Sequence, residues 1–135
     1  MTRQFVVQLD NRPGELAHLA KALAARGIDI RHIASAGAGP CACAFLTTTD
    51  TAATREVLHS LGSLFIEGSP IIVELADRPG AFAEVASTLD AAGVNILGSL
   101  IVGRKDGVVE MAFSVDDEEK ARAALGITDL VGVGD

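Results

Sequence analysis

Residues 7–33 read VQLDNRPGELAHLAKALAARGIDIRHI, and residues 73–99 read VELADRPGAFAEVASTLDAAGVNILGS. The two stretches align without gaps, and both carry an Arg-Pro-Gly triplet, whose prolines are Pro13 and Pro79. The difference between those two numbers, 66 residues, is the period of the repeat. Self-similarity at a fixed period indicates that one structural unit occurs twice along the chain.

The repeat divides the 135 residues into two small modules. We expect module 1 at residues 1–68 and module 2 at residues 69–135, with the join near Glu67-Gly68-Ser69-Pro70. Hydrophobic residues make up 49% of the chain and charged residues 21%. This composition is too apolar for a disordered chain and provides enough apolar side chains for packed cores.

Turn residues and apolar runs predict the secondary structure of each module. In module 1 we expect strands at residues 5–9, 28–34, 42–48 and 64–66, a helix from the Pro-Gly turn to about 26, and a helix from Asp50 or Thr51 to about 61. In module 2 we expect strands at 71–75, 94–102, 108–115 and 127–133, a helix from the second Pro-Gly turn to Gly93, and a helix from Asp116 or Asp117 to about 125.

The resulting order of elements is β-α-β-β-α-β, twice. This order predicts an α+β protein built from two ferredoxin-like βαββαβ modules, each an antiparallel sheet with helices on one face. A single module of this size leaves one sheet face uncovered and exposes strand edges, so we expect modules to pair. The sequence leaves open whether the pairing occurs within one chain or between two.

The turn before the first helix of each module is suited to binding a small anion. A helix N-terminus presents backbone N–H groups without partners and a partial positive charge. Gly14 and Gly80 have no Cβ, so a ligand can approach the backbone closely. Asn11 and Asp77 are expected to fix the turn through Asx-type hydrogen bonds. The alternative is a well-capped helix start with no ligand.

The sequence resembles the ACT domain, a small regulatory module that binds amino acids. The resemblance rests on LDNRPGELAHLAKALAARGIDI and LADRPGAFAEVASTLDAAGVNI, which carry the strand, the Asn/Asp-x-Pro-Gly turn, the helix, a glycine and an Asn or Asp before the next strand. It covers nearly the whole chain as two tandem copies. It implies an amino-acid site between the turn of one module and the start of the second strand of its partner.

The resemblance carries over to specific ligand-binding positions. The turn positions are Asn11, Arg12, Pro13, Gly14, Glu15 and Leu16 in module 1, and Asp77, Arg78, Pro79, Gly80, Ala81 and Phe82 in module 2. The strand positions are Asp29 and Asn95. An amide donates and accepts hydrogen bonds, whereas an ionised carboxylate only accepts. We therefore expect the better site to pair Asn95 with the first turn.

The resemblance implies a non-catalytic regulatory protein that binds a small amino acid at the interface between modules. We expect a homodimer, with a regulated enzyme or another protein as partner. The alternative is a protein-interaction or dimerisation module without a ligand. No nucleophile, metalloprotease or phosphate-loop motif is present, so we expect no enzymatic activity and no cofactor.

Charge and composition narrow the remaining function classes. The net charge is −7, which disfavours nucleic acid and anionic membrane surfaces as partners. No apolar run reaches the length of a membrane span, and we expect a cytoplasmic protein. Cys41 and Cys43 lack the second ligand pair of a zinc site, so we expect no metal and thiols packed in the core or at an edge.

Overall fold

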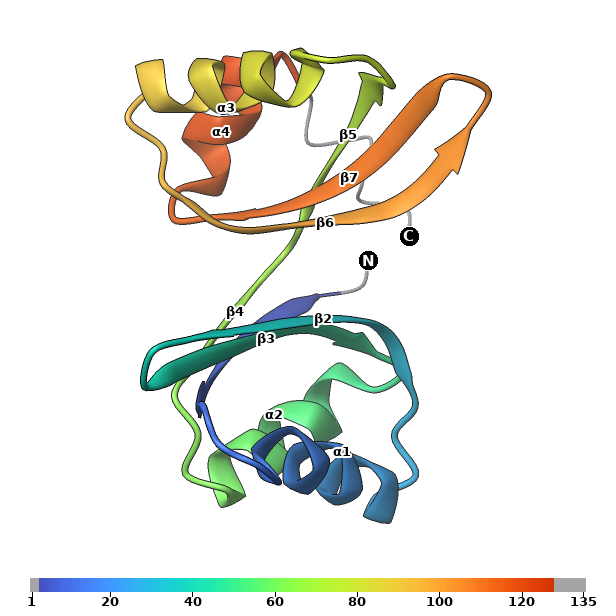
Figure 1. The fold of residues 1–135 in the computed structure, drawn as a ribbon, viewed down its shortest axis with the longest axis vertical. Helices are drawn as coiled ribbons and strands as arrows, with labels where there is room; N and C mark the ends of the chain where they lie inside the picture. The colour runs from blue at the N-terminus through green and yellow to red at the C-terminus, as the bar shows by residue number, and fades with distance from the viewer. Residues whose placement is uncertain (1–2, 128–135) are drawn as a thin grey trace. The chain divides into compact units, whose positions relative to one another are not determined.

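Module 1 ends at Gly68 and module 2 begins at Ser69 in the computed structural model, which describes residues 3–127 (Figure 1). The elements of module 1 are β1 (Gln4–Asp10), α1 (Glu15–Ala25), β2 (Ile30–Ala38), β3 (Cys41–Thr48), α2 (Thr51–Ser60) and β4 (Phe65–Gly68). Its antiparallel sheet has the strand order β2-β3-β1-β4. Both helices cover the same face of this sheet (Figure 1).

Module 2 repeats this arrangement. Its described elements are β5 (Ile71–Ala76), α3 (Ala81–Ala91), β6 (Ile96–Lys105), β7 (Val108–Val115) and α4 (Glu118–Leu125). The antiparallel strands have the order β5-β7-β6, and α3 and α4 lie on one face of them (Figure 1). The strand expected at 127–133 lies outside the described residues from position 128 onward. The predicted α+β fold of ferredoxin-like modules is confirmed.

Each module has its own hydrophobic core between helices and sheet. In module 1, alternate residues of β1 point toward the helices, so Phe5 and Val7 are fully buried against Leu23 of α1. In module 2, Ile71 of β5 and Leu89 of α3 take the positions of Phe5 and Leu23 and are also fully buried. Burying a side chain of this size contributes about 1.5–3 kcal/mol, so these residues anchor the helices to the sheets.

The second strand of each module begins later than predicted. β2 starts at Ile30 rather than at 28, because the amide of Ile28 donates to the carbonyl of Leu23 and closes the C-terminus of α1. Gly27, at φ +69°, provides the left-handed turn that this closure needs. The amide of Val94 likewise donates to the carbonyl of Leu89 at 2.9 Å and closes the C-terminus of α3. The sequence predicted the apolar run correctly and its start incorrectly.

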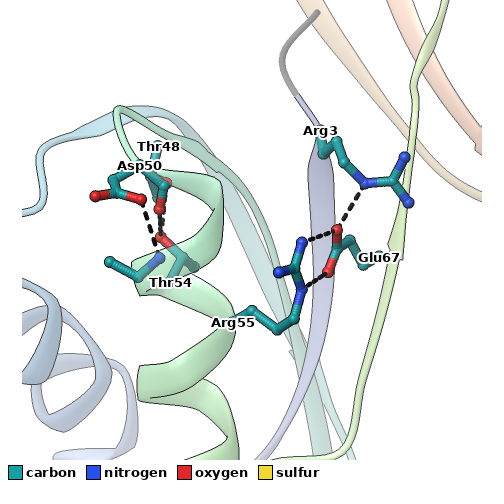
Figure 2. Close-up of polar contacts among 7 residues, drawn as sticks. Arg3, Thr48, Asp50, Thr54, Arg55 and Glu67 are labelled. Carbon is teal, nitrogen blue, oxygen red and sulfur yellow. Dashed lines mark hydrogen bonds and ion pairs between the residues drawn. The ribbon is translucent and has the colours of Figure 1, made fainter.

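The N-terminus of α2 is closed by a buried network of hydroxyl groups (Figure 2). Asp50 is the N-cap, and its Oδ1 accepts from the amide of Ala53 at 3.0 Å. The hydroxyl of Thr54, fully buried, donates to the carbonyl of Asp50 at 2.8 Å and shares a hydrogen bond with that of Thr48 at 2.7 Å. Asp117 is the N-cap of α4, and its Oδ1 accepts from the amide of Lys120 at 3.0 Å.

Glu67 joins β4 to two other elements of module 1 (Figure 2). Its carboxylate accepts hydrogen bonds from Nε and Nη2 of Arg55 on α2, both at 2.7 Å, and from Nε of Arg3 at 2.6 Å. The hydrogen bond with Arg55 is the main reason that the pKa of Glu67 falls from 4.5 to about 2, and partial burial opposes this shift. A two-point arginine–carboxylate contact fixes the orientation of both groups.

Candidate functional site

The turn that enters α1, residues 11–16, is called loop 1 below, and the equivalent residues 77–82 are called loop 2. Loop 1 leaves the start of the helix open. Gly14 is the N-cap at φ +90°, and no described side chain caps the helix. The amides of Leu16 and Ala17 have no hydrogen-bond acceptor among the described residues. A Cβ added to Gly14 would meet no atom within 4 Å, so the space above this backbone is open.

Asn11 fixes loop 1, but not through the Asx turn that we expected. Its Nδ2 donates to the carbonyl of Gly39 at 3.0 Å, in the turn between β2 and β3. The expected Asx turn is wrong, because the side chain of Asn11 would have to accept from the backbone N–H two residues further on. That residue is Pro13, which has no N–H. The backbone amide of Asn11 also donates to the carbonyl of Pro40. Loop 1 is thus held against the β2–β3 hairpin.

A cavity of about 230 Å³, called cavity 1 below, opens beside loop 1. Four residues of loop 1 line it together with the ends of three strands. Its lining consists of Leu9, Asp10, Asn11, Arg12, Glu15, Leu16, Ser35, Ala36, Gly37, Ala42 and Cys43. The predicted loop residues Asn11, Arg12, Glu15 and Leu16 are therefore brought together in one place.

The hairpin side of cavity 1 was missed by sequence reasoning. Asp10 and Ala38 both pair with Cys41, so the sheet places the end of β2 directly beside loop 1. The signal available in the sequence was the Gly39-Pro40 turn, which sets where β2 ends. Cys41 and Cys43 are exposed free thiols, so the expected packing of these side chains is wrong.

Arg12 is held at the rim of cavity 1 by two carboxylates. Its Nε donates to Glu15 at 2.9 Å, and its Nη2 lies 3.5 Å from Oδ2 of Asp10. The pKa of Arg12 is raised, chiefly by the hydrogen bond to Glu15 and then by the charges of Glu15 and Asp10. The guanidinium is thus paired with carboxylates of its own module, and its charge does not stand alone at the rim.

Loop 2 has the same backbone but different side-chain contacts. Gly80 is again the N-cap at φ +90°, without a described side-chain cap. Oδ2 of Asp77 accepts from Nη1 of Arg104 at 2.7 Å. Arg78 donates from Nη1 to the carbonyl of Pro79 at 3.2 Å and from Nη2 to Glu84 at 2.5 Å. A Cβ added to Gly80 would lie 3.7 Å from Nη1 of Arg78.

Asp29 and Asn95 lie at the other end of their own sheets. Both side chains are exposed, and both backbones are tied to the segment after the third strand of the module. The backbone N–H of Asp29 donates to Oγ1 of Thr49 at 3.0 Å, and the backbone N–H of Asn95 donates to Oδ1 of Asp116 at 2.9 Å. The full length of β3 separates loop 1 from Asp29, about 23 Å at ~3.3 Å per residue. One module therefore does not bring its own loop and its own strand start together.

Among residues 3–127, no three His, Cys, Asp or Glu side chains are grouped so that they could hold a metal ion. None of the helices in this part of the chain is long and apolar enough to cross a membrane.

Comparison with protein families decides the identity of module 2. Residues 71–130 match the ACT domain family. Module 2 is an ACT domain. Comparison with curated proteins gives no match. The family named from the sequence is thus confirmed, and the match lies on the second copy of the repeat.

Solved structures share the two-module fold of this chain. A protein from Bacteroides thetaiotaomicron superposes with a TM-score of 0.67 at 20% identity, over 93% of this chain and 88% of its own. The regulatory subunit of aspartate kinase from Thermus flavus gives 0.63 at 22%, over 93% and 90%. The ligand-free subunit from Thermus thermophilus gives 0.57 at 23%, over 93% and 89%. At these identities the likeness shows the fold alone.

Module 1 is an ACT-like copy of module 2. In module 1, Ala42 pairs with Leu9 on one side and with Gly37 on the other. In module 2, Val109 pairs in the same way with Leu75 and Arg104. The hairpin ends beside the two loops therefore correspond, so the two loop sites can be compared residue by residue. Farther along the hairpin the match is interrupted, because β6 has a register shift between Ile101 and Gly103 that β2 lacks.

Proposed function

We propose that this chain is a non-catalytic regulatory protein that binds a small amino acid at loop 1. The observation that carries the proposal is cavity 1, which lies beside a helix N-terminus without a side-chain cap. The open amides of Leu16 and Ala17 are suited to the α-carboxylate of the ligand. Carboxylates at the cavity wall, Asp10 and Glu15, are suited to its α-ammonium. A volume of about 230 Å³ favours a small side chain.

We further propose that a second module completes this site with the start of its second strand. The support is the separation within one module, where the length of β3 lies between loop 1 and Asp29. The contributing module belongs either to the same chain or to a second copy in a homodimer. Asn95 suits this role better than Asp29, because an amide offers a donor to the ligand carboxylate and an acceptor to its ammonium.

The regulatory part of the proposal is supported by the fold neighbours. Two of them are regulatory subunits of aspartate kinase, and this chain covers about nine-tenths of each. We propose that this chain likewise acts on an enzyme or another protein. Ligand binding would regulate that partner if the amino acid binds one arrangement of the modules more tightly than another.

One observation favours the second candidate, a dimerisation module without a ligand. β2 is the edge strand of its sheet, nine residues long, and Ile33 on it is 43% exposed. A long exposed edge offers unpaired backbone groups to another strand. In this reading loop 1 is only a helix start, and the chain acts by docking its edge on a partner.

Thermal unfolding with each proteinogenic L-amino acid separates the two candidates. A ligand that binds only the folded chain stabilises it by about 2.7 kcal/mol at a hundredfold excess over Kd. We expect at least one small amino acid to raise Tm, and Asn95→Ala to weaken its affinity at least tenfold in calorimetric titration. Asp29→Ala is the matched control and should leave the affinity unchanged. A flat response to every amino acid would leave the dimerisation module as the function.

A further inference from the structure

The two loops differ at one position of the facing hairpin. Gly37 and Arg104 occupy the same place in the two sheets. Gly37 pairs with Ala42, which pairs with Leu9 near the end of β1. Arg104 pairs with Val109, which pairs with Leu75 near the end of β5. In module 1 this place carries no side chain, and in module 2 it carries a guanidinium.

In module 1, Gly37 makes room for the side chain of Asn11. A Cβ at position 37 would lie 2.5 Å from Oδ1 and 2.7 Å from Cγ of Asn11. The amide side chain can therefore cross above Gly37 and reach the carbonyl of Gly39. Loop 1 is tied down by a neutral hydrogen bond, and cavity 1 stays open beside it.

In module 2, the same tie is an ion pair. The counterpart of Asn11 is Asp77, and it is held by the guanidinium of Arg104 at 2.7 Å. The guanidinium therefore fills, in module 2, the place that Gly37 leaves open at the wall of cavity 1. Both side chains remain about half exposed, so the ion pair by itself contributes only a modest free energy to closing loop 2.

A second arginine covers the backbone of loop 2. Nη1 of Arg78 lies 3.7 Å from the Cβ position of Gly80, whereas the same position at Gly14 is empty out to 4 Å. The equivalent residue of module 1, Arg12, is turned toward Asp10 and Glu15 instead. A cavity of about 510 Å³ on the β6–β7 hairpin is lined by Arg104 and its neighbours but by no residue of loop 2.

We propose that Arg104 determines the binding stoichiometry by filling, beside Asp77, the place that Gly37 leaves open for the ligand in module 1. It keeps loop 2 closed with the help of Arg78, so that each chain binds one amino acid, at loop 1. This inference rests on the proposed amino-acid site at loop 1 and deepens it, because it explains why a duplicated loop gives a single site.

Calorimetric titration with each proteinogenic L-amino acid tests the role of Arg104. The unaltered chain should bind one amino acid per chain. The variant Ala76→Asp/Asp77→Asn/Ala81→Glu/Arg104→Gly gives module 2 the polar side chains and the open place of the module 1 site, and should bind two. The variant Ala76→Asp/Asp77→Asn/Ala81→Glu keeps Arg104 and should still bind one. Arg26→Ala removes another exposed arginine, which donates to Glu56 at 3.0 Å, and is the matched control that should still bind one. The reciprocal variant Asn11→Asp/Gly37→Arg should close loop 1 and lose binding.

The outcomes separate this inference from the proposed function. Two bound amino acids in the unaltered chain, or one in the variant that combines all four substitutions, would refute the role of Arg104 and leave loop 1 as a site. No binding to the unaltered chain but one amino acid in that variant would support the blocking role and refute loop 1. No binding in either would refute both. Circular dichroism of the reciprocal variant identifies a loss of binding that comes from misfolding.

Discussion

Replacing Glu67 by Gln should destabilise module 1 in a pH-dependent way. The carboxylate is 14% exposed and holds two arginines, Arg3 just before β1 and Arg55 of α2. The pKa of Glu67 lies at about 2 instead of 4.5. Because one pKa unit corresponds to about 1.4 kcal/mol, this shift sets an upper limit of about 3.5 kcal/mol on the stabilisation. Because the side chains of Arg3 and Arg55 are 41% and 42% exposed, water screens the charges, and we expect about 1–2 kcal/mol.

The sign of the pH dependence follows from the lowered pKa. Glu67 stabilises the folded state fully above pH 4.5, where the carboxyl group is ionised in both folded and unfolded chains. The contribution is lost as the pH falls from 4.5 to about 2, because the unfolded chain takes up a proton before the folded one. The difference in unfolding free energy between the unaltered chain and Glu67→Gln should therefore shrink across this window.

Urea titrations followed by circular dichroism measure this difference at neutral pH and midway between the two pKa values. The matched control is Glu56→Gln, which breaks a more exposed pair with Arg26 and should cost no more than about 0.5 kcal/mol at either pH. The reasoning is refuted if Glu67→Gln is as mild as Glu56→Gln at neutral pH, or if its effect is the same at both pH values.

Two further predictions concern the cap of α2 and the contact beneath loop 1. Thr54→Val removes a buried hydroxyl that donates to the carbonyl of Asp50, and should lower the unfolding free energy measured by urea titration by about 1–2 kcal/mol. The control Thr88→Val, at an exposed position, should change the unfolding free energy by less than about 0.5 kcal/mol. Gly37→Ala should lower it by about 1 kcal/mol, since its Cβ displaces the side chain of Asn11. In an Asn11→Ala background the same substitution should cost less, and equal costs in the two backgrounds would show that the two residues do not interact.

The fold followed from the sequence because it depends on patterns that are local along the chain. The repeat, the Pro-Gly turns and the apolar spacing predicted the strands and helices of both modules. The exceptions were the starts of β2 and β6, where the amides of Ile28 and Val94 bond the end of the preceding helix instead of a neighbouring strand. An apolar run shows that a segment is buried but does not show which hydrogen bonds its backbone makes.

The candidate site followed only in part, because its other half depends on the pairing of strands. Loop 1 was readable from Asn11 and Gly14, whereas the contributions of Ser35 and Gly37 required the register of β2 against β3. The difference between the two loops was not readable either. Arg104 meets Asp77 across 27 residues of sequence, and the β5–β7 and β6–β7 pairings place them together.

Backbone-amide NMR of the full chain tests the central claim most directly. During titration with the amino acid that raises Tm most, the amide resonances of Leu16 and Ala17 should shift together with those of Ser35 and Gly37. These residues surround the open helix start and cavity 1. Saturable shifts confined to other parts of the chain, with these four amides unchanged, would show that loop 1 does not bind the amino acid.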